Sequence, residues 1–210
     1  MYRLLTNYSK YNEKIGYIQG MGDISAPFLI YMNEESAFFM LDALIENYGM
    51  KSVLENGFPK LNCIYYVHLN LLKKFMPTIY NLFKMLKIRP DLYATDWYVF
   101  LFSRILQFNA LVRVIDVFLL EGYKIVYRIA LAIIKINEEK IIKNLNSFGY
   151  FHKVFDNIND GIDPDLLLEK AFGFNISRKD IKKYENEYEL IKNQNNKNNE
   201  FFNQIEEMQF

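Results

Sequence analysis

The sequence lacks several features that would assign it to a common class of protein. Only one cysteine, Cys63, is present among 210 residues, so no internal disulfide can form. Basic and acidic residues both number 25, which gives a formal net charge of zero. A chain without excess positive charge has no electrostatic footprint for a nucleic-acid backbone. We therefore exclude a disulfide-rich secreted scaffold, expect no nucleic-acid partner and favour a reducing, cytoplasmic compartment.

Long apolar runs are absent as well. The longest stretches without a formal charge, 24–33 and 61–72, are shorter than the roughly 18 apolar residues of a membrane span. Residues 1–8 contain no apolar core of a signal peptide. These features predict no direct insertion into a membrane.

What the chain does contain is apolar residues at helical spacing. Hydrophobic residues make up 51% of the sequence, which is ample for a large core. Between Glu34 and Tyr48 they recur three and four positions apart, with Asn33 placed as N-cap and Gly49 as C-cap. Strand-like alternation is essentially missing, so the pattern predicts an all-α fold.

The same spacing predicts further helices along the chain. The segment 95–106 is apolar on nearly every side and should lie at the centre of a core. The other expected helices are 61–75, one beginning at Pro77, 109–120, 124–136, 137 to about 145, 163–170 and 177 to about 191. Residues 193–210 are Asn-rich and polar, and we expect a disordered tail there.

One segment, 15–29, departs from this helical pattern. It carries three glycines within seven residues, and Gln19 lies between the first two. Glycines allow backbone conformations and close approaches that other residues resist. A helix could begin at Ser25, with Pro27 in its first turn, or earlier at Gly22, with Pro27 inside the helix. Either alternative places Gln19 in a tight turn or at a helix start.

These residues resemble the TBC domain, a family that accelerates GTP hydrolysis by Rab-family small GTPases. Gly16-Tyr17-Ile18-Gln19-Gly20-Met21 is similar to the family's glutamine-finger motif Y-x-Q-G-M. Arg113-Val114-Ile115-Asp116-Val117-Phe118-Leu119-Leu120-Glu121-Gly122 resembles its R-x-x-D-x-F-L-x-E-G motif. Tyr93-Ala94-Thr95-Asp96-Trp97, together with Leu101-Phe102-Ser103-Arg104, resembles the family's block that precedes this second motif. The resemblance covers roughly residues 4–152.

The resemblance implies an all-α, multi-helix TBC domain of about 10–12 helices. It implies a TBC core over 1–152, C-terminal helices over 153–192 and the tail over 193–210. The partner would be a GTP-bound Rab-family GTPase, which itself holds GTP and Mg, so no cofactor is expected on this chain. Through that partner the protein could sit peripherally on endomembranes.

The resemblance also implies roles for individual residues. Gln19 would be the catalytic glutamine, inserted in trans beside the γ-phosphate. Tyr17, Gly20 and Met21 would contact the GTPase. The residues of the second motif that would have a structural role are Arg113, Asp116, Glu121 and Gly122.

The residues themselves leave alternatives to these roles. Gln19 could merely satisfy backbone groups of a Gly-rich turn, and Tyr17 could pack in the core or support Gln19 through its hydroxyl. Asp116 stands among apolar residues, so we expect an ion pair with Arg113 or Arg128.

Other polar side chains carry weaker signals. Glu121 is expected to be solvated or structural. His68 and His152 are too far apart in sequence to show the ligand spacing of a metal site, and Cys63 has no histidine at the spacing of a nucleophile motif.

The chain departs from the family at the arginine finger. The family carries this arginine in an I-x-x-D-x-x-R motif upstream of the glutamine, and the 18 residues before Gln19 contain only Arg3 and no such motif. We therefore expect either an N-terminally incomplete TBC domain, which we favour, or an arginine-less member. The alternative functions are a non-catalytic GTPase-binding or scaffolding module, and a helical domain whose partner is not a GTPase.

Overall fold

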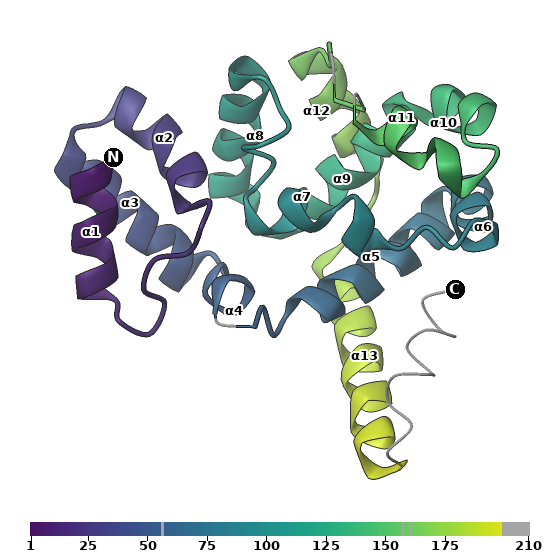
Figure 1. The fold of residues 1–210 in the computed structure, drawn as a ribbon, viewed down its shortest axis with the longest axis horizontal. Coiled ribbons are helices and arrows are strands. Elements are labelled where there is room, and N and C mark those ends of the chain that lie inside the picture. The colour runs from purple at the N-terminus through teal and green to yellow at the C-terminus, as the bar shows by residue number, and fades with distance from the viewer. Residues whose placement is uncertain (56, 157, 160, 199–210) are drawn as a thin grey trace. The chain divides into compact units, whose positions relative to one another are not determined.

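The computed structural model describes residues 1–55, 57–156, 158–159 and 161–198, with side chains as far as Gln194. The described residues form thirteen α-helices and two 3₁₀ helices and contain no strand (Figure 1). The all-α prediction is confirmed. The number of helices exceeds the expected 10–12 because short helices such as Lys51–Leu54 and Phe151–Phe155 are counted separately.

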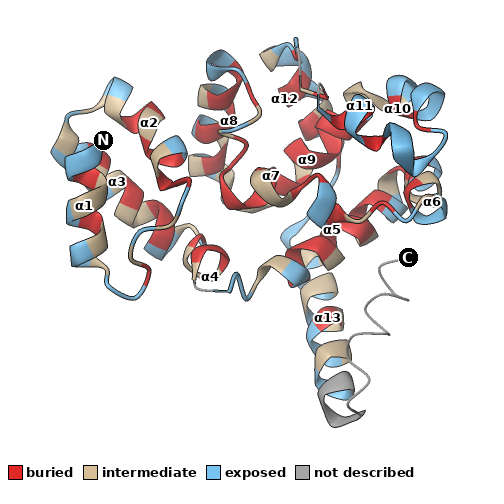
Figure 2. Cartoon of the chain, in the orientation of Figure 1, coloured by how far each residue is buried: buried red, intermediate tan, exposed pale blue. Residues whose placement is uncertain are grey.

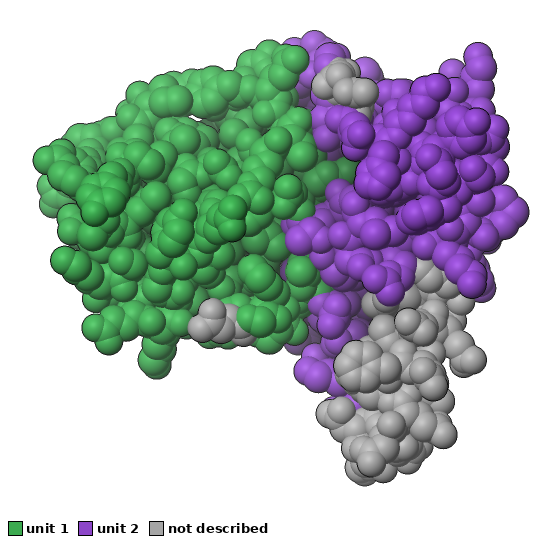
Figure 3. Space-filling view, in the orientation of Figure 1, with its two compact units in different colours: residues 1–61, 96–126 green, residues 62–95, 127–210 purple. Residues whose placement is uncertain are grey.

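The chain divides into two compact units, coloured separately in Figure 3. Unit 1 comprises 1–61 and 96–126, and unit 2 comprises 62–95 and 127–210. Each unit is therefore built from two separate segments of the chain. Composition contains no sign of this division, and the boundary at residue 152 stays a prediction.

Unit 1 is organised around its third helix. In chain order its helices are α1 (Tyr2–Tyr11), α2 (Met21–Tyr31), α3 (Glu34–Asn47), α4 (Lys51–Leu54), α7 (Thr95–Val99) and α8 (Phe108–Glu121). α3 contacts α1, α2 and α4. Its N-cap is Asn33, whose side-chain oxygen accepts a hydrogen bond from the Ser36 amide at 2.8 Å, as the sequence predicted. Gly49, just beyond its end, has a φ of +81°, which a glycine adopts without a Cβ clash.

The helix predicted over 95–106 is wrong beyond Val99. α7 ends there, and the next residues form turns in which Leu101 and Phe102 have φ values of +49° and +63°. Two successive left-handed residues cannot continue a right-handed helix, and each costs roughly 1–2 kcal/mol. Both side chains are buried, so their packing offsets this strain. The predicted burial of the segment is thus confirmed, although its helical continuation is not (Figure 2).

Unit 2 contains a helix that is buried along most of its length. Its elements are α5 (Leu61–Phe75), α6 (Pro77–Met85), η1 (Pro90–Leu92), α9 (Lys124–Ile136, which begins in unit 1), α10 (Glu138–Asn144), η2 (Phe148–Tyr150), α11 (Phe151–Phe155), α12 (Pro164–Gly173) and α13 (Arg178–Asn198). All six residues from Ile129 to Ile134 on α9 are fully buried. On α9 only the charged residues Lys124, Arg128 and Lys135 and the terminal Ile136 are not buried, so most of this helix lies in a core.

The last helix is fixed at its start by a reciprocal cap. The Ser177 hydroxyl oxygen accepts from the Asp180 amide at 3.1 Å, and an Asp180 carboxylate oxygen accepts from the Ser177 amide at 3.0 Å. Lys74 of α5 donates to the other Asp180 oxygen at 2.8 Å, and these bonds lower the pKa of Asp180. From this cap α13 continues to Asn198, so residues 193–198, expected in the tail, are helical. Residues 199–210 of that tail lie outside the described residues.

A neutral histidine is buried inside unit 2. His68 of α5 is fully buried, and its Nε2 shares a 2.7 Å hydrogen bond with the hydroxyl of Tyr93. Burial penalises the charged imidazolium and lowers the pKa of His68 from 6.5 to about 3. Below pH 6.5 His68 therefore binds a proton in the unfolded chain, whereas in the folded chain it stays neutral down to about pH 3.

This histidine should make the protein sensitive to acid. Above pH 6.5 His68 does not reduce the free energy of unfolding. Below pH 6.5 its protonation in the unfolded chain lowers that free energy by about 1.4 kcal/mol per pH unit, down to about pH 3. We expect His68→Gln to flatten the pH dependence of the free energy of unfolding, measured by urea titration between pH 7 and pH 4. His152→Gln, at an exposed position, is the matched control. Equal pH dependence in wild type and His68→Gln would contradict this assignment.

Candidate functional site

The Gly-rich segment forms a well-defined turn between α1 and α2. It begins at Asn12, whose carbonyl accepts from the Gly16 amide at 2.7 Å, and Ile15 anchors it in the core. It ends at Gly20, the N-cap of α2, whose carbonyl accepts from the Asp23 amide at 2.9 Å. Helix α2 starts at Met21, which is closer to the earlier of the two predicted starts. Gln19 thus immediately precedes the N-cap, as the helix-start interpretation predicted.

Pro27 lies inside α2 rather than in its first turn. It cannot donate a backbone hydrogen bond to the Asp23 carbonyl one turn earlier. Ser25 is fully buried nearby, and its hydroxyl donates to the Met21 carbonyl at 2.7 Å. This bond satisfies the buried hydroxyl within the first turns of the helix.

Gly20 is required at its position for two reasons. Its φ of +106° is one that side-chain-bearing residues rarely adopt. A Cβ at this position would also lie 2.3 Å from Phe100 Cε1 and 2.8 Å from an Arg104 guanidinium nitrogen. The backbone before α2 is therefore in direct contact with the turns that follow α7.

Gln19 itself is exposed, and its side-chain amide makes no hydrogen bond to another described residue. This finding does not favour the alternative in which Gln19 only satisfies backbone groups of its own turn. A glutamine amide offers two donors and an acceptor, and here they face solvent. The turn therefore presents, on a fixed backbone, a solvent-facing amide that is available to a partner.

The neighbours of Gln19 differ in exposure. Tyr17 is 59% exposed, so the core-packing interpretation of this residue is wrong and its ring is accessible to a partner. Met21 is only 1% exposed and anchors the start of α2. Burial of Met21, and of Gly20 beneath Phe100 and Arg104, favours a supporting role over direct contact with a GTPase.

A charged cluster that the sequence pattern does not signal lies against this turn. Arg104 Nε donates to an Asp23 carboxylate oxygen at 2.8 Å, and Nη1 donates to Asp96 at 3.3 Å. Its guanidinium carbon lies 3.8 Å from the ring centroid of Phe100. The hydrogen bond to Asp23 is the main cause that raises the pKa of Arg104. Because about 80 residues separate Asp23 from Arg104, no local spacing signals this cluster.

The second motif occupies α8 and the turn after it. Asp116 is exposed, so the desolvation that motivated its predicted ion pair does not arise. Arg128, one predicted partner, instead donates from Nη2 to the Ile176 carbonyl at 3.0 Å within unit 2. Glu121 pairs with Lys124 at 2.7 Å, in agreement with a structural role.

The remaining motif residues lie on the same helix or at its end. Gly122 reverses the chain with a φ of +69° and donates to the Phe118 carbonyl at 2.8 Å. Arg113 is exposed on α8. The second motif therefore shapes the turn between α8 and α9 and is not part of the Gln19 turn.

We also searched the described part of the chain for a metal-binding cluster and for a membrane-spanning helix. No group of three or more His, Cys, Asp or Glu side chains could hold a metal ion there. None of the described helices has the length and apolarity needed to span a bilayer.

The requirement for glycine at position 20 can be tested against Gly16. Gly20→Ala should lower the free energy of unfolding by about 2–5 kcal/mol, the sum of a left-handed backbone penalty and overpacking against Phe100. Gly16 has a φ of +64°, but a Cβ added there would meet no atom within 4 Å, so Gly16→Ala should cost only about 1–2 kcal/mol. Urea unfolding measures both. Equal losses would show that Phe100 does not constrain the turn.

Comparisons with known proteins identify the family to which the chain belongs. A family model described as the Rab-GTPase-TBC domain matches residues 1–142. The human ecotropic viral integration site 5 protein homolog is 27% identical over 195 residues, which is 91% of this chain and 24% of that protein. The GTPase-activating protein GYP5 of Saccharomyces cerevisiae is 33% identical over 144 residues, which is 68% of this chain and 16% of that protein.

A solved structure supports the same assignment. The Chlamydomonas flagellar RabGAP TBC domain superposes with a TM-score of 0.69 at 28% identity, over 81% of this chain and 57% of that chain. The chain thus spans less than a quarter of these two curated relatives and little more than half of the solved domain. The family match covers most of the chain, and the protein belongs to the Rab-GTPase-TBC domain family.

Proposed function

We propose that this chain binds a GTP-loaded Rab-type GTPase and places Gln19 beside the γ-phosphate to accelerate hydrolysis. One observation carries the proposal: Gln19 is exposed, without a hydrogen-bond partner among the described residues, on a turn that Gly20 holds against Phe100. Relatives named as GTPase-activating proteins, among them Rab GTPase-activating protein tbc-11 of Caenorhabditis elegans, support the choice of reaction.

The chemistry suits a glutamine. Phosphoryl transfer to water needs an oriented nucleophile and stabilisation of charge on the transferring group. The Gln19 carbonyl can accept a hydrogen bond from the attacking water while its NH₂ group donates one to a phosphate oxygen. An amide does not titrate, so this orientation is the same at every physiological pH. GTP and Mg would both arrive with the GTPase, and the chain would reach membranes through that partner.

A second candidate function has an observation in its favour. An arginine supplied in trans is worth roughly 10³ to 10⁵ in rate. Arg3 pairs with Glu34 on α3, and Arg104 pairs with both Asp23 and Asp96. Either arginine would have to break its ion pairs to reach a phosphate. This favours, as the alternative, a module that binds the GTPase without accelerating hydrolysis.

The assay that separates these functions is single-turnover GTP hydrolysis by a panel of GTP-loaded Rab proteins, with the full chain in excess. If the chain stimulates hydrolysis, Gln19→Ala should reduce the stimulation by about 10²-fold, the scale of one preorganised transition-state contact. Gln194→Ala, at an exposed glutamine on α13, should leave the stimulation unchanged.

The outcomes discriminate clearly. Undiminished stimulation by Gln19→Ala would refute the role of Gln19. Selective binding to the GTP-bound over the GDP-bound form, without any acceleration, would establish the non-catalytic module. Absence of both binding and acceleration across the panel would leave a helical domain whose partner is not a GTPase.

A further inference from the structure

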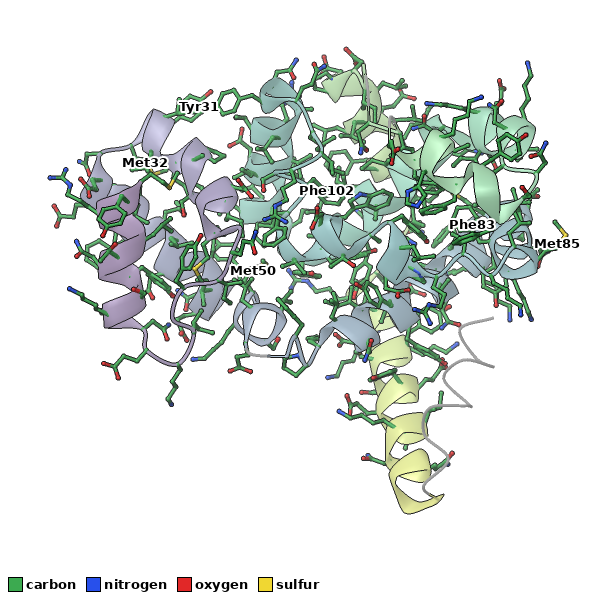
Figure 4. All side chains as sticks on the ribbon, viewed as in Figure 1. Tyr31, Met32, Met50, Phe83, Met85 and Phe102 are labelled. Carbon is green, nitrogen blue, oxygen red and sulfur yellow. The ribbon has the colours of Figure 1, made fainter. Side chains whose placement is uncertain are left out.

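Two side chains of unit 1, those of Phe100 and Arg104, lie against Gly20, and two carboxylates, those of Asp23 and Asp96, are bonded to Arg104. Phe100 and Arg104 come from the turns after α7, Asp96 from the first turn of α7, and Asp23 from the first turn of α2. All four belong to the same compact unit as Gln19. Phe102, in the middle of the same turns, is labelled in Figure 4.

The guanidinium of Arg104 is held on three sides. Its central carbon lies over the Phe100 ring, 3.8 Å from the centroid, where a cation is attracted to the ring's negative face. Nε is bonded to Asp23 at 2.8 Å and Nη1 to Asp96 at 3.3 Å. Nη2 is the nitrogen that a Cβ on Gly20 would meet at 2.8 Å, so it lies directly against the turn.

The charges in this cluster decide between two uses of Arg104. Two carboxylates surround one guanidinium, which leaves the group with a net negative charge. Such a cluster repels a phosphate, so it does not suit an arginine that acts on the nucleotide. It suits an arginine that links two segments of backbone.

The backbone that carries Arg104 supports this view. Leu101 and Phe102 are both left-handed, and strain of this kind persists only where surrounding contacts enforce it. Their side chains are buried, and the rings of Phe102 and Trp97 lie 6.2 Å apart. These strained turns carry Phe100 and Arg104, whose side chains both lie against Gly20.

We propose that Arg104 is a positioning residue. Its guanidinium lies over Phe100 and is bonded to Asp23 and Asp96, and it thereby fixes the Gly20 turn and the direction of Gln19. The structural part of this assignment stands without any partner, and only its kinetic part rests on the proposed function. Lysine cannot replace arginine here, because an ammonium group neither stacks as a plane nor bonds two carboxylates through a rigid fork.

The structural part is tested by NMR relaxation of the ¹⁵N-labelled full chain. In wild type the backbone amides of Gln19 and Gly20 should have order parameters near 0.85, the value of a rigid backbone. Arg104→Lys should lower them to below about 0.6 while amides of α3 keep their wild-type values. Arg89→Lys is the matched control, because Arg89 forms a bidentate pair with Asp91 in unit 2. A rigid Gln19 turn in Arg104→Lys would overturn the proposal.

A second variant keeps the proposal testable if Arg104→Lys does not fold. The double substitution Asp23→Asn and Asp96→Asn keeps the guanidinium on Phe100 but weakens both tethers. It should raise the mobility of Gln19 and Gly20 with a melting temperature close to that of wild type. If this variant folds and its turn stays rigid, the tethers do not position Gln19 and the proposal fails.

The kinetic part uses the same Rab panel. Arg104→Lys should lower kcat for stimulated hydrolysis by about ten- to hundredfold, since small misplacements of a reacting group are costly, with little change in KM for the GTP-loaded GTPase. A mobile turn with this loss supports both proposals. A mobile turn with unchanged stimulation supports the positioning role and refutes the catalytic role of Gln19. A rigid turn with a raised KM and unchanged kcat would show that Arg104 serves binding and would overturn the positioning role.

Discussion

The close approach of Phe100 and Arg104 to the Gly20 backbone is the constraint on which the site depends. It requires a residue without a Cβ at position 20, and it fixes the start of α2 against turns about 80 residues away in sequence. Gln19 directly precedes Gly20, so the direction in which the Gln19 side chain leaves the turn is set by backbone that this contact holds in place. An exposed side chain on such a backbone loses little conformational freedom on binding, which is the general advantage of preorganisation.

The strained turns after α7 have a cost that the surrounding core offsets. Leu101 and Phe102 adopt left-handed conformations, yet their side chains, and those of Trp97 and Tyr98, are buried. Burial of large apolar side chains contributes roughly 1.5–3 kcal/mol each, which exceeds the strain of one left-handed residue. A segment whose sequence favours a helix is thus held in turns by the side chains it buries. Strain of this kind often occurs where a functional group must be aimed.

Much of the fold was predictable because local signals and packing agree. Asn33 and Ser177 act as caps, Pro77 begins a helix, and Gly122 ends one, as their chemistry predicts. The failures have physical causes. The helix predicted over 95–106 is interrupted because tertiary contacts outweigh its propensity. Helix α13 extends past residue 192 because a strong cap starts a helix that polar residues can continue.

The site was predictable only in part. The glycine pattern and the family resemblance single out Gln19 and place it at a helix start. Exposure cannot be read from the sequence, which left core packing open as an alternative for Tyr17 and predicted an ion pair for Asp116 among apolar residues, although both side chains are exposed. The cluster of Arg104, Asp23 and Asp96 is formed by residues distant in sequence, and only the fold brings them together.

The central claim is that the Gln19 turn meets the transferring phosphoryl group of a GTPase. Its most direct test is an NMR titration of the ¹⁵N-labelled chain with an unlabelled Rab protein loaded with GDP and aluminium fluoride, a mimic of that group. We expect the side-chain amide of Gln19 and the backbone amides of Tyr17 and Gly20 to shift strongly, and much less with the GDP form alone. Binding that perturbs other surfaces and leaves Gln19 unchanged with the mimic would contradict this account.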